Sequence, residues 1–526
     1  MRTMTTRPEP RPDVAWRILL LAFVLLLAGC ASPVPREHGT ALTLVEAEAT
    51  TLGQWAASQA AAHPGQSGFE LLASGQDAFL LRALLGRRVE RQLDIQTYFM
   101  GDDLTTRVLL WHLLEAAERG VRVRLLLDDL RTAGQGERLA ALDSHPNIEV
   151  RVYNALALGR GSLMARVLAA LPQAARQHRR MHNKLWISDG AVAIVGGRNL
   201  GDEYYSAGGE PRNFTDLDLM AIGPVVPALS RSFDLYWNHG LAQPLARYHV
   251  AAPGAWQALA TSLAEWLETQ TDAPYLVVLR RRYADEGPAT LVERLHWGEG
   301  VALWDPPGKP AWPGRPPLSR TLGGALLARA PTPDDRLTLI SAYFVPGEAG
   351  TRWLATQAET GVEVTVITNS LEATDVSLVH GAYQRRRPAL LASGVALHEL
   401  KSDPSALTEP VSGLAASPSA LHLKALAIDG TWLFVGSANA DPRSVWWNTE
   451  VGLLVRSESL AAEFRDLAEL GMDPRLSYRV GLSAAGRLYW ETVVAGESRR
   501  LTREPGSHWQ RFMAWLGRVL PLEPWL

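Results

Sequence analysis

Two ten-residue segments of this chain carry the same polar pattern. Residues 181–190 read MHNKLWISDG, and residues 421–430 read LHLKALAIDG. Each has a His, a Lys two residues later and an Asp five residues after the Lys. The residues are His182, Lys184 and Asp189 in the first copy, and His422, Lys424 and Asp429 in the second. A pattern that recurs with identical spacing indicates a duplicated structural unit.

Both copies also predict a β-hairpin. The apolar runs KLWIS and AVAIV flank Asp189-Gly190, and KALAI and TWLFV flank Asp429-Gly430. Asp-Gly between two apolar runs is a strong signal for a two-residue hairpin turn. Because each Asp lies in the expected turn, a turn or salt-bridge role for it competes with direct participation in chemistry.

The repeat extends upstream of the hairpins. RQLDIQTYF and DRLTLISAYF read as strands, and each is followed by a helical stretch, a Gly and a second strand. This alignment matches the Tyr-Phe pair 98–99 with the Tyr-Phe pair 343–344. Strands that alternate with helical patterns predict α/β layers around a largely parallel or mixed sheet.

Downstream of each hairpin, an Asn follows the His by 17 residues. These residues are Asn199 and Asn439. Further along, NFTDLDLM aligns with NTEVGLLV and places Asp216 opposite Glu450, although the loop before Asp216 is longer than its counterpart. One His, one Lys, one Asn and one acidic residue per half predict a single site where the two halves meet.

We therefore predict an α/β fold of two pseudo-symmetric lobes with one active site at their interface. The expected segments are a lipoprotein signal peptide at 1–29, an N-terminal leader at 30–75, a first lobe at 76–240, a connector at 241–330, a second lobe at 331–470 and a C-terminal extension with an amphipathic helix at 471–526. A length of 526 residues agrees with two or three domains.

Composition excludes some functional classes. Hydrophobic residues make up 47% of the chain and charged residues 20%, which is typical of a globular protein. The net charge of −3 gives no electrostatic reason to expect a nucleic-acid partner. The sequence lacks a Gly-x-Ser-x-Gly elbow, a Walker loop and a His-Glu-x-x-His zinc pattern.

The N-terminus indicates export. An Arg-rich stretch precedes ILLLAFVLLLAGC, whose apolar run is shorter than the ~20 residues of a spanning helix. Cys30 is the single cysteine and ends a stretch that looks like a bacterial lipobox, so we expect it to be lipidated. The resulting lipoprotein would be anchored in a membrane. Ala31 and Ser32 follow Cys30, without the Asp at the next position that would retain a lipoprotein elsewhere, so we expect the outer membrane, facing the periplasm. A signal anchor that is not cleaved is the alternative.

The duplicated residue set suits a phosphodiester. Two Lys ammoniums and two Asn amides, at Lys184, Lys424, Asn199 and Asn439, could hold its oxygens and stabilise a pentavalent transition state. One imidazole could attack phosphorus while the other protonates the leaving oxygen. A carboxylate on the second nitrogen of each ring would fix its tautomer, and Asp216 and Glu450 are the candidates. This chemistry requires neither a metal nor a cofactor.

These motifs resemble the phospholipase D superfamily over roughly residues 75–470. Within it, RRMHNKLWISDGAVAIVGGRNLGDEYY and GSANADPRSVWWNTEVGLLV are similar to the bacterial cardiolipin synthase C type. The resemblance implies transfer of a phosphatidyl group between phospholipids through a phosphatidyl-histidine, with His182 as the nucleophile and His422 as the general acid and then base. It implies phosphatidylglycerol, with phosphatidylethanolamine as a possible donor, and a membrane surface as partners.

Two alternatives remain open at this stage. Water could replace the lipid acceptor, which would give a phospholipase D that releases phosphatidic acid. A non-catalytic envelope protein that binds lipid is the other alternative, although both motifs are intact.

Two further segments have ambiguous patterns. Arg385, Arg386 and Arg387 could bind lipid headgroups or form a solvated helix face, and His380 nearby could approach the site. HWQRFMAWLGRVL, at residues 508–520, predicts a helix with an apolar stripe of Trp509, Phe512, Met513, Leu516 and Leu520. That stripe could lie in a membrane interface or pack onto the domain.

Overall fold

The computed structural model describes residues 38–156, 162–170, 174–208, 213–290, 295–402 and 419–525. The expected signal peptide and Cys30 lie outside the described residues. Among those residues, no helix has the length and apolar character that a membrane span requires.

Each lobe contains a mixed β-sheet with the same strand order. In the first lobe the hydrogen-bonded neighbours run β9-β4-β3-β2-β5-β6-β8-β1. These strands are β1 (Ser67–Leu72), β2 (Gln92–Thr97), β3 (Arg122–Asp128), β4 (Ile148–Tyr153), β5 (Leu185–Ser188), β6 (Val192–Gly196), β8 (Asp218–Ile222) and β9 (Ala242–Pro244). Strands β2, β3 and β4 are parallel, and the other pairs are antiparallel.

The second lobe repeats this plan as β18-β13-β12-β11-β15-β16-β17-β10, with β19 and β20 added beyond β18. These strands are β10 (His296–Trp304), β11 (Arg336–Ser341), β12 (Glu363–Asn369), β13 (Ala396–Leu400), β15 (Lys424–Ile428), β16 (Trp432–Gly436), β17 (Val451–Arg456), β18 (Ser477–Leu482), β19 (Leu488–Val494) and β20 (Glu497–Leu501). The prediction of two similar α/β lobes with a mixed sheet is confirmed.

Strand β10 joins the two sheets. Residues 296–298 pair with β1 of the first lobe, and residues 299–304 pair with β17 of the second lobe. β10 therefore occupies the position in the second lobe that β1 occupies in the first. Both strands belong to the sheets although they precede the lobe boundaries expected from the sequence, so much of the expected leader and connector is part of the fold.

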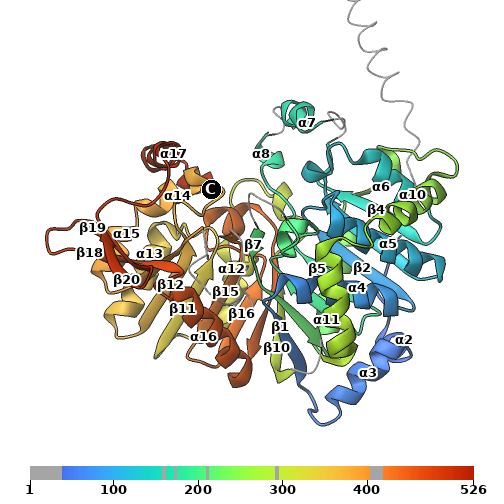
Figure 1. Cartoon of the computed structure of the whole chain (residues 1–526), viewed down its shortest axis with the longest axis horizontal. Coiled ribbons are helices and arrows are strands. Elements are labelled where there is room, and N and C mark those ends of the chain that lie inside the picture. Colours follow the sequence, from blue (N-terminus) through green and yellow to red (C-terminus); the bar gives the residue numbers. More distant parts are fainter. Residues whose placement is uncertain are drawn as a thin grey trace, which may run out of the picture. The chain divides into compact units, whose positions relative to one another are not determined.

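Helices cover the outer faces of both sheets, as Figure 1 shows. Those of the first half are α2 (Leu44–Glu48), α3 (Thr51–Ala60), α4 (Gly75–Arg88), α5 (Leu104–Glu118), α6 (Gly136–Asp143), α7 (Leu163–Ala170), α8 (Ala174–Gln177), α9 (Val226–Trp237), α10 (Ala255–Thr269) and α11 (Pro274–Thr290). Those of the second half are α12 (Leu322–Arg329), α13 (Gly347–Glu359), α14 (Ser377–Gln384), α15 (Arg387–Ala392), α16 (Glu458–Met472) and α17 (His508–Val519).

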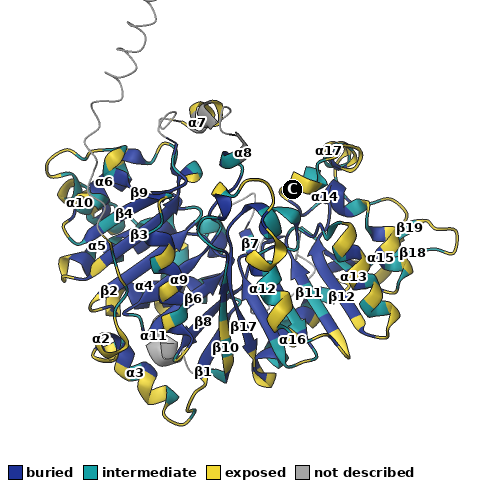
Figure 2. Ribbon diagram, turned by 180° about the vertical axis from the view of Figure 1, so that it is seen from behind, coloured by how far each residue is buried: buried dark blue, intermediate teal, exposed yellow. Residues whose placement is uncertain are grey.

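The strands of the first predicted hairpin, β5 and β6, are buried throughout, whereas β15 and β16 of the second are partly exposed at residues 426, 427 and 432 (Figure 2). Along β5, Trp186 packs into the core beneath the outer helices, whereas Leu185 and Ile187 face a second core. This second core also contains Leu433 and Phe464 of the other lobe. Alternate residues of a strand point to opposite faces, so each sheet fills one core of its own lobe and one shared core. The shared core fixes the two lobes against each other.

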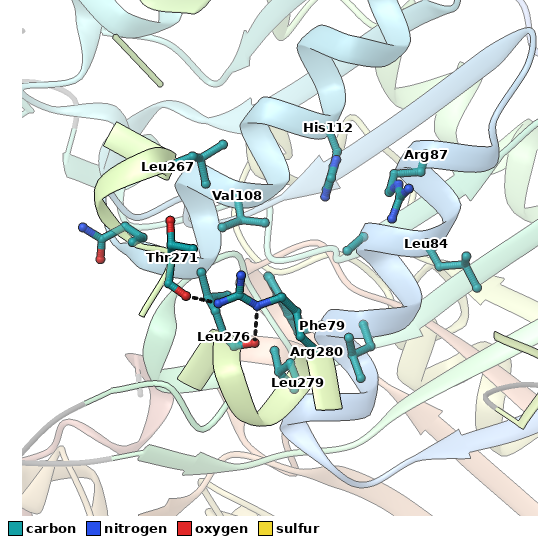
Figure 3. A pocket seen from close by; sticks show the side chains of 13 residues that line it. Phe79, Leu84, Arg87, Val108, His112, Leu267, Thr271, Leu276, Leu279 and Arg280 are labelled. Carbon is teal, nitrogen blue, oxygen red and sulfur yellow. Dashed lines mark hydrogen bonds between the residues drawn. The ribbon is translucent and has the colours of Figure 1, made fainter. Parts of the chain in front are cut away.

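An apolar pocket of about 310 Å³ lies among the outer helices α4, α5, α10 and α11 of the first lobe (Figure 3). The Arg280 side chain in it donates to the carbonyl oxygens of Leu276 on α11 and of Thr271 in the connection between α10 and α11. The pocket is not lined by any of the repeated His, Lys or Asn residues. It is therefore separate from the site that the repeat predicts.

Candidate active site

The structure brings the two His patterns together from opposite lobes. The backbone N–H of His182 donates to the carbonyl of Thr449 (2.9 Å), and that of His422 donates to the carbonyl of Thr215 (2.8 Å). In addition, β7 (Asn213–Thr215) pairs in parallel with β14 (Ser419–Leu421) across the interface. Each His segment is thus hydrogen bonded to the segment that precedes the acidic residue of the other lobe.

Each imidazole is held by the acidic residue of the other lobe. His182 Nδ1 lies 3.0 and 3.2 Å from the two carboxylate oxygens of Glu450, and His422 Nδ1 lies 2.6 Å from Asp216 Oδ2. Both carboxylates are fully buried, whereas 14% of the His182 side chain and 11% of the His422 side chain are exposed. Since Nδ1 is engaged on both rings, Nε2 is the nitrogen left for chemistry.

The lysines lie beside the imidazoles of their own segments. Lys184 Nζ donates to the His182 carbonyl (2.7 Å), and Lys424 Nζ donates to the His422 carbonyl. Burial lowers the pKa of both lysines, and the Lys424 ammonium lowers the pKa of Lys184 further. Carboxylates nearby act on both lysines, but in the described part of the chain neither ammonium forms a direct ion pair with one, so both can bind an anion such as a phosphate group.

Burial also lowers the pKa of both imidazoles. That of His182 falls to about 4, despite the opposing effect of Glu450, and that of His422 falls in the same direction. Burial alone would raise the pKa of Asp216 and Glu450, but the facing imidazoles and lysines lower both. The site therefore combines neutral imidazoles with ionised carboxylates, which is the state that a nucleophilic nitrogen requires.

The two Asn residues lie at the edge of the site. Asn199 Oδ1 accepts from the backbone N–H of Phe99 (3.2 Å), and its Nδ2 donates to the Tyr204 hydroxyl (2.8 Å). Asn439 Oδ1 accepts from the backbone N–H of Tyr343 (3.4 Å). Within the described residues, no hydrogen bond is found for Asn439 Nδ2, so this donor is available for a ligand oxygen.

The two Asp residues of the repeat lie at the opposite ends of β5 and β15 from the lysines. Asp189 accepts from the backbone N–H groups of residues 90–92 at 2.8–3.0 Å, and Asp429 accepts from those of residues 334–336 at 2.9–3.3 Å. Both have positive φ, at 53° and 50°, and each is followed by a glycine at 62°. Positive φ at both positions matches a type I′ turn, so a hairpin at each Asp-Gly is confirmed. The loops are longer than the two residues expected, because Ser188 pairs with Val192 and Ile428 with Trp432, which leaves residues 189–191 and 429–431 between the strands.

The turn geometry also separates these Asp residues from the imidazoles. Five residues of extended chain between Lys184 and Asp189 span roughly 16 Å. A direct catalytic role for Asp189 and Asp429, which the sequence pattern suggested, has no contact to support it here. Their carboxylates instead tie each hairpin turn to the strand beside it.

Aromatic rings surround the two imidazoles unequally. The edge of Tyr98 meets His182 (5.3 Å between ring centroids), and Lys184 Nζ lies 5.6 Å from the centre of the same ring. His422 is flanked by Tyr204 (5.4 Å) and Phe214 (5.1 Å). The two halves of the site are therefore related in their polar residues but not in their apolar walls.

The matched Tyr-Phe pairs are shifted by one residue in the structure. Thr97 corresponds to Ser341, because each hydroxyl donates to the carbonyl two residues later (3.0 and 2.8 Å). Tyr98 therefore corresponds to Ala342, and Phe99 corresponds to Tyr343. The alignment expected from the sequence is wrong at this point because matching the Tyr-Phe letters ignored the alternation of the strand.

Several residues that support the site were not found by sequence reasoning. Arg180 forms a buried ion pair with Asp128 (2.6 Å), which also accepts from the N–H of Met181. Asp305 accepts from the N–H of Glu450 (3.0 Å) and pairs with Lys309. Arg180 stands in the quoted RRMHNK stretch, but its position gave no signal for such a role, and Asp305 lies in the expected connector.

A further difference between the halves explains why the acidic residue is Glu450 in one half and the shorter Asp216 in the other. Ser437 Oγ donates to Glu450, whereas the corresponding Gly197 faces Asp216. A Cβ atom at Gly197 would collide with the Asp216 carboxylate. The Gly in one copy and the Ser in the other thus fit the acidic residue that each must accommodate.

Comparison with known proteins agrees with this geometry. Residues 87–212 and 326–469 match a family described as cardiolipin synthase, PLD-like domain. The chain belongs to this family. It is 38% identical to cardiolipin synthase C of Escherichia coli over 88% of this chain and 97% of that protein. It is also 32% identical to an uncharacterised protein of Helicobacter pylori J99, over 79% of this chain and 81% of the relative.

A solved structure supports the fold alone. The crystal structure of a phosphatidylserine synthase from Haemophilus influenzae Rd KW20 matches with a TM-score of 0.51 and 11% identity. The match covers 78% of this chain and 87% of that one. The similarity to the phospholipase D superfamily and to the cardiolipin synthase C type that the motifs indicated is confirmed.

Proposed function

We propose that this protein transfers a phosphatidyl group from one phospholipid to the hydroxyl of another and so forms cardiolipin. The observation that carries the proposal is the reciprocal pairing of His182 with Glu450 and of His422 with Asp216 across the lobe interface. One imidazole from each lobe in one site supplies a nucleophile and an acid for a double displacement. The 38% identity to a cardiolipin synthase over most of the chain supports the choice of reaction.

In the first step, His182 Nε2 attacks phosphorus and forms a phosphorus–nitrogen bond. The bond from phosphorus to the leaving glycerol oxygen breaks, and that oxygen takes a proton from His422 Nε2. In the second step, the acceptor hydroxyl gives its proton to His422 and attacks phosphorus. The phosphorus–nitrogen bond breaks, which releases the new diester and restores both imidazoles.

The environment of the two rings supports this assignment of roles. His422 contacts its carboxylate at 2.6 Å, whereas His182 contacts its own at 3.0 Å. A shorter contact to an ionised acid stabilises an imidazolium more strongly, which suits the proton carrier. The pKa of about 4 at His182 keeps that ring neutral and nucleophilic.

We assign the phosphate oxygens to Lys184 and Lys424, with Asn199 and Asn439 at the rim. The negative charge of a phosphodiester would restore the ordinary pKa of the lysines and raise that of His422 toward the protonated form. Asp189 and Asp429 then serve the fold by anchoring the hairpins. The proposal requires neither a metal nor a cofactor.

We propose phosphatidylglycerol as a substrate, with phosphatidylethanolamine as a possible donor, at a membrane surface. We further propose that Cys30 is lipidated and holds the exported protein on a membrane, with the outer membrane facing the periplasm as the expected location. The family membership supports phospholipid substrates, and the N-terminal sequence supports the anchor.

The test is incubation of the purified protein with labelled phosphatidylglycerol, with and without phosphatidylethanolamine. Labelled cardiolipin is the expected product. Phosphatidic acid as the sole labelled product would replace transfer with hydrolysis. Lys184→Ala and Lys424→Ala should abolish turnover, and variants that bind lipid normally and still complement a deletion strain would support the non-catalytic alternative.

Trapping distinguishes the two imidazoles. His422→Ala should still form some covalent adduct with a donor whose leaving group needs little protonation, and should then stall because the acceptor is not activated. His182→Ala should form none. An adduct mapped to His422 in the His182→Ala protein would reverse the roles, and adducts at both positions in the wild type would contradict the single site.

A further inference from the structure

The C-terminal helix α17 packs through its smallest residues. Its buried positions are Ala514 and Gly517, which face α14. A methyl group on Gly517 would collide with the carbonyl of Leu378, and one on Gly381 would collide with that of Ala514. The close approach of the two helices therefore depends on glycine, and it uses only a narrow face of α17.

The large apolar side chains of α17 point away from this contact. Trp509 is 68% exposed, and Phe512 and Trp515 are each 48% exposed. Their rings follow one another at centroid distances of 5.6 and 6.1 Å, and Val519 continues the stripe. Exposed aromatic residues that gather on one helix face mark an interaction surface rather than a part of the core.

The polar surroundings of this stripe suit an anionic lipid. Arg385, Arg511 and Arg518 lie around it, and no ion pair to any of them is found in the described part of the chain. Arg385 instead donates to the carbonyls of Arg518 and Leu520, and Arg511 donates to that of Glu504. Their positive charge is therefore not neutralised by a facing carboxylate. Aromatic residues beside arginines are typical of helices that lie in a membrane interface.

The remainder of the basic run holds the same segment in place. Arg386 pairs with Glu523 (2.7 Å), and the buried Arg387 pairs with Glu399 (3.0 Å) and with Glu504. Arg386 and Arg387 thus fasten the chain before and after α17. His380 contacts Glu504 (2.8 Å) in this network rather than approaching the catalytic imidazoles.

The segment that follows α17 reaches the neighbourhood of the active site. Trp525 stacks on Trp447 (5.6 Å), whose indole donates to the carbonyl of Pro524 (2.9 Å). The ring of His178, four residues before His182, meets both indoles edge-on at 5.4 and 5.6 Å. Trp447 itself lies between Asn439 and Glu450 in sequence. The stripe on α17 is therefore connected to residues that adjoin both His segments.

A second apolar helix lies on the same side. Helix α7 exposes Met164, Val167 and Leu168, and α8 (Ala174–Gln177) ends directly before His178. Figures 1 and 2 view the molecule from opposite sides, and both show α7 and α17 at the same upper edge of the fold. Two exposed apolar helices thus lie at one edge, and each is continuous with a segment beside the catalytic residues.

We infer that α17, together with α7, docks this protein on the surface of a phospholipid bilayer and presents the catalytic interface to its lipid substrates. This inference deepens the proposed function, on which it rests for the identity of the substrate. Trp509, Phe512 and Trp515 enter the interfacial layer, and Arg511 and Arg518 contact anionic headgroups. The occupant is the lipid surface itself, and neither a second copy nor another protein is required.

The single cysteine of the chain allows a direct test. In a Cys30→Ser background, Phe512→Cys on α17 is labelled with an environment-sensitive fluorophore, and Trp353→Cys on α13 is the matched control on another helix. Both proteins keep the same N-terminus, so any tethering by that segment is equal. Vesicles of phosphatidylglycerol and phosphatidylethanolamine should shift the emission of the label at position 512 to the blue and leave the control unchanged.

Three outcomes would overturn the inference. The first is an unchanged emission at position 512 after vesicles are added, and the second is an equal change at both positions. The third is a blue shift at position 512 that grows with protein concentration without vesicles, which would assign the stripe to a second copy. This readout does not depend on turnover, so it remains decisive even if the proposed reaction fails.

Turnover provides the second measurement. The triple variant Trp509→Ser/Phe512→Ser/Trp515→Ser should lose about tenfold or more of its activity on vesicles. It should keep wild-type activity on phosphatidylglycerol dispersed in detergent, and Trp353→Ser should behave as wild type in both assays. An equal loss on both substrates would show that the stripe supports the fold rather than lipid docking. Absence of turnover in the wild type would instead contradict the proposed function.

Discussion

Replacing Asp216 with Asn tests the central pairing of the site. Asp216→Asn keeps the size of the side chain and removes its charge. Asp216 is fully buried, with Oδ2 at 2.6 Å from His422 Nδ1. Although burial would raise its pKa, the charges of His422 and Lys424 hold the pKa of this carboxyl well below its usual range. The native residue is therefore ionised when His422 carries a proton.

The size of the effect follows from the lost attraction. Two unit charges whose centres are about 4 Å apart interact by about 4 kcal/mol at an effective dielectric constant of about 20. Since each ~1.4 kcal/mol changes a rate about tenfold, the steps that form or use the His422 imidazolium should slow by about 10³-fold. An Asn that donates its NH₂ to Nδ1 would also favour the tautomer with its proton on Nε2, which cannot accept the acceptor's proton.

The assay is single-turnover transfer from the preformed adduct to an acceptor lipid, compared with adduct formation from an activated donor. Asp216→Asn should slow transfer by about 10³-fold and leave adduct formation much less affected. Glu450→Gln is the matched control from the other half, and it should mainly slow adduct formation on His182. Thermal unfolding of both variants should confirm that the fold is kept.

The reasoning would be refuted if Asp216→Asn transferred within about tenfold of the wild-type rate while remaining folded. Equal slowing of adduct formation in Asp216→Asn and Glu450→Gln would refute the assignment of each carboxylate to the opposite lobe's imidazole.

The remaining predictions concern the hairpins, the pH profile and the anchor. Asp189→Ala leaves three backbone N–H groups without their acceptor and should cost about 2–4 kcal/mol in denaturant unfolding, while the folded fraction keeps its kcat; Asp429→Ala should cost less, because that carboxylate is partly exposed. A loss of kcat without a loss of stability would instead indicate that these Asp residues take part in catalysis. Since burial lowers the pKa of His182 to about 4, adduct formation should persist as the pH falls to about 5 and disappear as protonation removes the ring's lone pair near pH 4. A pH midpoint of adduct formation near 6.5 would contradict the claim that burial lowers the pKa of His182. Cys30→Ser should abolish labelling by a fatty-acid analogue, and equal labelling of wild type and variant would remove the lipoprotein proposal.

The sequence by itself determined the local features of this protein. The Asp-Gly hairpins follow from residues adjacent in the chain, since a type I′ turn needs positive φ at both central positions and Asp-Gly provides it. The repeated spacing of His, Lys and Asn follows from the duplicated strand order. The candidacy of Asp216 and Glu450 came from the same alignment. Each of these depends on short-range geometry or on repetition, which can be read from one chain.

The tertiary structure decided which groups meet. The sequence did not specify which carboxylate would hold which imidazole, and the structure shows an exchange in which His182 receives Glu450 and His422 receives Asp216. The exchange arises because β7 pairs with β14 and residue 181 pairs with residue 449, so each His lies beside the acidic segment of the other lobe. Contacts between residues more than 200 positions apart depend on how the shared core packs, and no local pattern encodes that choice.

The same reason explains the other differences. The expected connector contains β10, whose pairing with both sheets depends on two distant strands, β1 and β17. The apolar stripe of α17 could face the core or a lipid surface on its pattern alone. Gly381 and Gly517 determine which face of α17 is buried. Because they lack side chains, the narrow face of α17 packs on α14, and the aromatic residues remain exposed. Periodicity determined that an apolar stripe exists, but long-range packing determined its exposed face: Met513 and Leu516 of the expected stripe are half-buried, whereas Trp515 and Val519 are exposed beside Trp509 and Phe512.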